Sequence, residues 1–257
     1  MAVGSQTVNP APTATTVSSS PDPSVVGQSV TFTATVAPVA PGGGSVTGTV
    51  TFDFGDGSAT VTVPVAGGTA TATHAYADAT ASPFTVTATY NGSALYAGSS
   101  GSDTQTVNQA GTSTVVSSSP DPSVVGQPVT FTAVVAPVAP GAGTPTGPVV
   151  FDFGDGSPTQ SATLVGGTAS VTHSFASATG SPFTVTAAYG GDGDFGGSSG
   201  SVVQSVVQAG TTTTVSSSPD PSVVGEPVTF TVAVAPVAPG AGTPTGPVTL
   251  DFGDGSA

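Results

Sequence analysis

Apolar and polar residues alternate along several short stretches of this chain. Residues 29–37 read SVTFTATVA and residues 84–90 read FTVTATY, so the side chains at every second position are apolar in both stretches. Alternation with a period of two is typical of β-strands that bury one face. Stretches rich in glycine and proline, such as residues 38–48, separate these segments and predict turns and loops.

Seven strands are predicted in the first complete repeat of this pattern, and they favour an all-β fold, a seven-stranded β-sandwich. The strands are expected at residues 13–18, 29–37, 49–54, 59–65, 69–76, 84–90 and 103–108. The pair Gly67-Gly68 predicts a hairpin between the fourth and the fifth. Six aromatic side chains are expected to supply most of the bulk of the core: Phe32, Phe52, Phe54, Tyr76, Phe84 and Tyr90.

The pattern recurs with a period of 99 residues. Ser18, Ser117 and Ser216 each open the string SSSPDPSVVG. The period predicts two complete modules, 13–110 and 111–209, in a chain of 257 residues. Residues 1–12 are expected to be the last strand of a preceding repeat, and residues 210–257 the truncated front half of a further one. These ends predict that the natural array is longer on both sides.

The charges of this chain exclude several classes of function. It has 14 acidic residues, no lysine, no arginine and no cysteine, which gives a net charge of −14. Nucleic acids are bound through Lys and Arg, so no nucleic-acid partner is expected. Disulfides, zinc thiolate sites and a Schiff-base lysine are excluded as well. No apolar run is long enough for a membrane helix, and no signal peptide opens the chain, so any targeting signal is expected outside it.

One candidate site is the Gly-Asp-Gly turn that follows the third strand, together with one histidine in each complete repeat. The glycines permit positive φ, and the aspartates can accept backbone N–H bonds. We predict that the imidazole hydrogen-bonds near this turn and fixes two strands, and that no catalytic triad forms. The residues of this structural motif are Asp53, Gly55, Asp56, Gly57 and His74, and in the second repeat Asp152, Gly154, Asp155, Gly156 and His173.

A second candidate is a calcium site. Asp192 and Asp194 could offer oxygens to calcium, with Asp155 as a third ligand. The spacing does not match an EF-hand loop, and the first repeat has no carboxylate in the corresponding segment. A repeated metal site should recur in each repeat, so loop decoration is the alternative that we favour. We expect no cofactor and no catalytic residue.

The chain resembles two families of extracellular modules. Residues 52–58 (FDFGDGS), the segment His74-Ala75-Tyr76 and the strand at 84–88 resemble the polycystic-kidney-disease (PKD) domain. Residues 15–32 resemble the bacterial Ig-like repeats of long surface proteins. Both resemblances imply tandem Ig-like β-sandwiches that serve as a spacer, an adhesive stalk or a module attached to an enzyme.

The function that we expect is therefore mechanical and not enzymatic: a spacer, stalk or adhesin rod of a bacterial extracellular or cell-surface protein. Its partners would be neighbouring repeats of the same chain. One alternative is the subunit of an extracellular filament, associating with itself through open sheet edges. Another is a module of a secreted hydrolase that binds surface polysaccharide, with Tyr96 and Phe195 as the best candidates for exposed aromatic residues.

Overall fold

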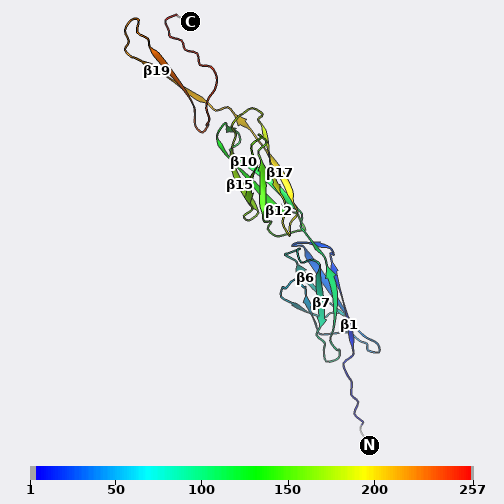
Figure 1. Cartoon of the computed structure of the whole chain (residues 1–257). Helices are drawn as coiled ribbons and strands as arrows, with labels where there is room; N and C mark the ends of the chain where they lie inside the picture. Colours follow the sequence, from blue (N-terminus) through cyan, green and yellow to red (C-terminus); the bar gives the residue numbers. More distant parts are fainter. Residues whose placement is uncertain (1–3, 256–257) are drawn as a thin grey trace. The chain divides into compact units, whose positions relative to one another are not determined.

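The computed structural model of the chain describes residues 4–255, which form β-strands and no helix (Figure 1). Accordingly, no helix within these residues is long and apolar enough to cross a membrane. The chain divides into two compact units. Unit 1 contains the described residues up to 113 together with 135–147 and 189–198, and unit 2 contains 114–134, 148–188 and the described residues from 199 onward.

The first repeat folds into two antiparallel sheets that share one core. One sheet has the order β1-β3-β6 and the other β5-β4-β7-β8, while β2 and β9 form a short parallel pair. The strands are β1 (Thr13–Ser20), β2 (Ser24–Val25), β3 (Ser29–Pro38), β4 (Thr49–Asp53), β5 (Val61–Pro64), β6 (Thr69–Ala75), β7 (Phe84–Tyr90), β8 (Ser99–Gln105) and β9 (Val107–Asn108). The all-β sandwich predicted from the alternating pattern is confirmed.

Alternation places the core residues as expected. On β3 the side chains of Val30, Phe32, Ala34 and Val36 are buried, and the residues between them are exposed or half-buried. The six aromatic residues that were expected to fill the core are all buried, with Phe84 the most exposed at 5%. These rings are the large apolar side chains of a core that has no tryptophan, and apolar burial is the dominant favourable contribution to folding.

The second repeat has the same plan. Its strands are β10 (Thr112–Ser119), β11 (Ser123–Val124), β12 (Pro128–Pro137), β13 (Pro148–Asp152), β14 (Gln160–Thr163), β15 (Thr168–Ser174), β16 (Phe183–Tyr189), β17 (Ser198–Gln204) and β18 (Val206–Val207). The sheets have the orders β10-β12-β15 and β14-β13-β16-β17, with β11 beside β18. Near-identical sequences therefore give the same topology twice.

The hairpin predicted at Gly67-Gly68 is only partly correct. The two glycines have positive φ, and Ala66 and Thr69 exchange backbone hydrogen bonds across them, so the tight turn exists. However, β5 pairs with β4, whereas β6 pairs with β3 in the other sheet. The chain thus changes sheets at this turn: β6 buries Ala70 and Ala72 in the core, whereas no residue of β5 is buried.

The ends of the chain also differ from the expectation. Residues 4–10 form no strand, and Ala11 makes one bridge, to Tyr96. The strand expected at 103–108 begins earlier and divides into β8 and β9. In the front half of the further repeat, β19 (Thr211–Ser218) and β20 (Thr229–Pro236) make a hairpin. The apolar side chains Phe230 and Phe252 contact each other there but stay 42% and 52% exposed.

Candidate functional site

The Gly-Asp-Gly turn after β4 is held by its own aspartates. Asp53 Oδ1 accepts the N–H of Gly55 at 3.0 Å, and Asp56 Oδ1 accepts the N–H of Ser58 at 3.0 Å. Gly55 has φ +77°, and a Cβ there would lie 2.4 Å from the carbonyl oxygen of Thr85. Because that contact is with backbone, only glycine fits at this position.

The histidine of the first repeat lies against this turn. His74 Nε2 lies 2.6 Å from Asp56 Oδ2, and the side chains of His74 and Asp56 are 17% and 18% exposed. The imidazole stacks on Phe54, with ring centroids 4.2 Å apart and planes 3° apart. The hydroxyl of Tyr76 donates to the carbonyl oxygen of Phe54 at 3.1 Å. Through these contacts β6 and the turn after β4 are joined, although they belong to different sheets.

The second repeat reproduces the His–Asp contact and the ring stacking, with Phe175 in the place of Tyr76. His173 Nε2 lies 2.8 Å from Asp155 Oδ2, and the ring stacks on Phe153 with centroids 3.9 Å apart. Asp152 Oδ1 accepts the N–H of Gly154, as Asp53 does from Gly55. The structure therefore brings together the predicted motif residues within each repeat, including the glycines Gly57 and Gly156, which both have positive φ.

The order of the polar groups does not suit nucleophilic catalysis. Ser58 Oγ donates to Asp56 Oδ1, and His74 contacts the other oxygen of the same carboxylate. The aspartate thus lies between the hydroxyl and the imidazole. In a Ser-His-Asp triad the histidine lies between the other two, so that it can take the proton of the hydroxyl.

The electrostatics of the turn favour the ionised aspartate. Burial by itself would raise the pKa of Asp56, but the hydrogen bonds from Ser58 and the contact with His74 outweigh burial and lower this pKa below its usual value. The pKa of Asp155 is lowered for the same reasons, with Ser157 and His173 as the partners. A charged carboxylate is therefore the form that the folded turn binds best.

The calcium candidates are engaged by protein donors instead. Asp192 Oδ1 accepts the N–H groups of Asp194 and Phe195, and its Oδ2 accepts the N–H and Oγ1–H of Thr146 at 2.8 and 2.7 Å. Although burial raises the pKa of Asp192, these bonds lower it to about 2 overall. Asp155 is bound to His173, as described above. No group of three or more His, Cys, Asp or Glu that could hold a metal ion occurs in the described part of the chain.

A buried glutamine in each repeat was missed by the sequence reasoning. Gln105 is fully buried, and its Nε2 lies near four acceptors: the carbonyl oxygens of Pro21 and Thr106, Asp22 Oδ1 and Ser24 Oγ. Gln204 is equally buried and bonds to three of the corresponding acceptors of its own repeat: the carbonyl oxygens of Pro120 and Ser205, and Ser123 Oγ. The sequence does contain a signal for this residue: a glutamine recurs at the end of β8 and at the end of β17.

The two aromatic residues considered for a polysaccharide platform are not exposed, and that expectation is wrong. Tyr96 is 6% exposed and donates its hydroxyl to the carbonyl oxygen of Gly43, and Phe195 is 4% exposed. Both rings are covered because the loops that carry them bridge back to Ala11 and Ala110 respectively. An aromatic surface for stacking on sugar rings is therefore not formed by these residues.

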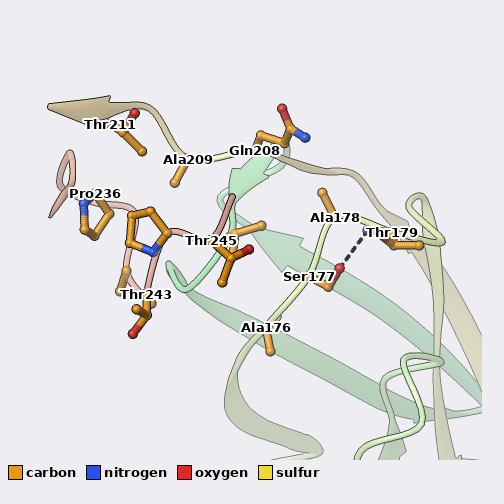
Figure 2. Close-up of a pocket in the computed structure, with 14 residues that line it drawn as sticks. Ala176, Ser177, Ala178, Thr179, Gln208, Ala209, Thr211, Pro236, Thr243 and Thr245 are labelled. Atoms are coloured by element: carbon orange, nitrogen blue, oxygen red, sulfur yellow. Dashed lines mark hydrogen bonds between the residues drawn. The ribbon is translucent and has the colours of Figure 1, made fainter. Parts of the chain in front are cut away.

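One cavity of the described surface lies within unit 2. It is a cavity of about 610 Å³, lined by no charged side chain. Figure 2 shows parts of its lining: residues 176–179, residues 208–211, Pro236, and a loop that carries Thr243 and Thr245. Small and polar side chains dominate this lining, which contains no carboxylate, imidazole or thiol.

Comparison with known proteins identifies the family of this chain. The model of the family described as "Bacterial Ig-like domain (group 3)" matches residues 15–108 and 116–208. No curated protein matches the chain. The family match agrees with the resemblance to bacterial Ig-like repeats, while the resemblance to PKD domains stays a prediction.

Solved structures similar to this chain include Ig-domain proteins from several sources. The ectodomain of mouse nectin-like molecule 4 is 15% identical, with 75% of this chain and 63% of that chain covered and a TM-score of 0.33. The Yersinia pseudotuberculosis adhesin InvE is 15% identical, with 74% and 58% covered and a TM-score of 0.36. The Escherichia coli adhesin FdeC is 15% identical, with 86% and 72% covered and a TM-score of 0.30. The chain thus spans less than two thirds of the first two of these proteins.

Proposed function

Because the chain belongs to the bacterial Ig-like domain family (group 3), we propose that it is a non-catalytic repeat segment that acts as a spacer or stalk in a secreted or surface-anchored bacterial protein. Such a segment has to keep consecutive modules at a defined spacing and carry tension along its sheets. Neither task needs a catalytic group. Both tasks need a connection between repeats that does not lengthen freely.

The observation that carries this proposal is the connection inside unit 1. β9 ends at Asn108 and β10 begins at Thr112, so three residues join the repeats. Gln109 Nε2 donates to the carbonyl oxygen of Asp192 at 2.6 Å. Ala110 donates its N–H to the carbonyl oxygen of Asp194 and accepts the N–H of Gly196, both at 2.9 Å. A linker whose backbone is bonded in this way cannot extend as a free chain does, which supports the role of a spacer.

The same proposal agrees with the cross-links between sheets. In each complete repeat one His–Asp pair and one buried glutamine tie segments that are far apart in the sequence. Small extracellular sandwiches are often strengthened by disulfides. Since this chain has no cysteine, we infer that these polar contacts take over that stabilising role.

Force spectroscopy on single molecules tests the mechanical part of the proposal. The chain would be held between two marker domains, and two unfolding events of equal length are expected from the two complete repeats. Each event should lengthen the chain by roughly 30 nm, since 99 residues extend to about 3.5 Å each and the folded length is subtracted. Extension without force peaks would contradict a role in carrying tension.

The location is tested separately. An antiserum raised against the purified chain should label intact cells of the bacterium that makes it, or precipitate the protein from its culture medium. A signal that appears only after the cells are broken would contradict a secreted or surface location.

A further inference from the structure

The loop of residues 191–195, within unit 1, carries two carboxylates and is held by hydrogen bonds from residues that precede it in the sequence. Its first carboxylate, Asp192, accepts two hydrogen bonds from Thr146. The carbonyl oxygen of Asp192 accepts a bond from Gln109 Nε2 at 2.6 Å. The second carboxylate, Asp194, accepts the N–H of Ala79 at 2.8 Å. Three separate donors thus hold one acidic loop.

The copies of these three donors line the cavity of unit 2. Adding the period of 99 residues converts Ala79 to Ala178, Gln109 to Gln208 and Thr146 to Thr245, and all three of the resulting residues lie around that cavity (Figure 2). Within the described part of the chain, none of these three groups (the Ala178 N–H, the Gln208 amide and the Thr245 hydroxyl) has a hydrogen-bond partner. The cavity therefore presents the same donors without the acidic loop.

The space for the aromatic ring of the loop is open as well. A Cβ on Gly143 would lie 2.8 Å from the Cζ atom of Phe195, so that glycine makes room for the ring. Its copy is Gly242, which lines the cavity, and a Cβ there would meet nothing within 4 Å. The cavity of unit 2 thus includes the volume that a phenylalanine ring fills in unit 1.

The cavity of unit 2 has fewer negative charges around it than the corresponding surface of unit 1, which favours an acidic occupant. In unit 1 the carboxyl of Asp78 lies within interaction distance of Asp194, which places two acidic groups together. The copy of Asp78 is Ser177, whose hydroxyl accepts the N–H of Thr179 at 3.0 Å (Figure 2). Replacing a carboxylate by a hydroxyl removes a like charge from the site.

From these correspondences we propose that the cavity lined by Ala178, Gln208, Gly242 and Thr245 is a docking socket for the Asp-x-Asp-aromatic loop of a further repeat of this type. The two carboxylates would bind Thr245 and the N–H of Ala178, and the aromatic ring would lie over Gly242. The inference goes beyond the proposed function, because it names a binding surface and its ligand wherever the protein resides.

The test uses the full chain and a defined probe. The probe is residues 189–198 as a peptide closed head to tail, added to the ¹⁵N-labelled chain while the amide resonances are recorded. Shifts are expected at residues 176–179, 208–211 and 241–245. A peptide with both Asp192→Asn and Asp194→Asn should bind about tenfold more weakly, because the hydrogen bonds from Thr245 and from the Ala178 N–H would no longer go to charged acceptors.

Two variants of the chain distinguish binding at the socket from non-specific binding of the peptide. Thr245→Val keeps the shape of the side chain but removes its hydroxyl donor, and it should weaken binding of the probe about fivefold. The matched variant Thr146→Val removes the same donor within unit 1 and should leave binding unchanged. Absent shifts, equal binding of the Asn peptide, or equal effects of the two variants would each overturn the proposal. None of these results would alter the force or localisation measurements, so the two proposals fail separately.

Discussion

The amide nitrogen of Gln105 lies 3.2 Å from the hydroxyl oxygen of Ser24, and both side chains are at most 1% exposed. All four neighbours of this nitrogen are hydrogen-bond acceptors. This position therefore requires a side chain that donates hydrogen bonds, as the NH₂ group of glutamine does. The same contact recurs between Gln204 and Ser123. The contact ties the end of β8 to the start of β2.

Replacing this amide by a carboxylate should be severely destabilising. Gln105→Glu would place a negative charge, or an acceptor oxygen, against Asp22 Oδ1 and two carbonyl oxygens, so we expect a loss of about 3 kcal/mol or more of unfolding free energy. Chemical denaturation measures this loss. The matched control is Gln28→Glu, since the corresponding position of the third repeat is already Glu226 and accepts the N–H of Val223 in the same way. Equal stability of the two variants would contradict the role assigned to Gln105.

The His–Asp pairs predict a second effect on stability. His74→Ala removes the contact with Asp56 and the stacking on Phe54, and His173→Ala does the same in the second repeat. Each change should cost about 1–3 kcal/mol and lower the melting temperature. A double-mutant cycle with Asp56→Asn isolates the contribution of the pair. An unchanged melting temperature in both histidine variants would refute the structural role of the motif.

Stability should fall at both extremes of pH, for different reasons. Asp56, Asp155 and Asp192 have lowered pKa values, with that of Asp192 at about 2. Their contribution is present above the usual pKa of an unfolded aspartate, about 3.9, and is lost as pH falls toward the folded values. Burial, and then the neighbouring Asp192, raise the pKa of Tyr189 to about 12, so its contribution is lost as pH rises from about 10 to 12.

Denaturation midpoints measured from pH 2 to pH 12 check this profile. Asp192→Asn removes one of the titrating groups, so that variant should lose less stability than the parent between pH 4 and pH 2. A parent profile that stays flat below pH 4 would show that these carboxylates do not stabilise the fold.

A fourth prediction concerns Gly27. It has φ +76°, and a Cβ there would lie 2.3 Å from the carbonyl oxygen of Ala142, whose N–H donates to Val26. Gly27→Ala should therefore disrupt this contact within unit 1 in addition to the strain of about 1 kcal/mol that alanine suffers at positive φ. Hydrogen exchange at the Ala142 amide should become faster.

Gly57→Ala is the control for Gly27→Ala. Gly57 has φ +80°, but a Cβ there would meet nothing within 4 Å, so only the backbone strain applies. This control should leave exchange at Ala142 unchanged. Faster exchange in both variants would mean that backbone strain, and not the close contact, is responsible.

Much of the fold could be predicted because it depends on local patterns. The alternation in residues 29–37 and 84–90 gave strands, buried faces and aromatic core correctly, since a strand alternates its side chains between two faces whatever its neighbours are. The Gly-Asp-Gly turn was predictable for the same reason, since its aspartates bond to N–H groups two residues later. Tyr96 and Phe195 were misplaced because their burial depends on Ala11 and Ala110, which lie 85 residues away from them.

By itself, therefore, the sequence determined the repeat, the all-β class and the exclusion of lysine, arginine and cysteine chemistry, because these follow from composition and from periods of 2 and 99 residues. Tertiary structure alone decided which strand joins which sheet, so that β5 and β6 separate after a tight turn. It also decided that Gln105 is buried among acceptors and that the copies of three loop-binding donors surround one cavity. These features arise from contacts between residues that are distant in the chain, and no local pattern encodes such contacts.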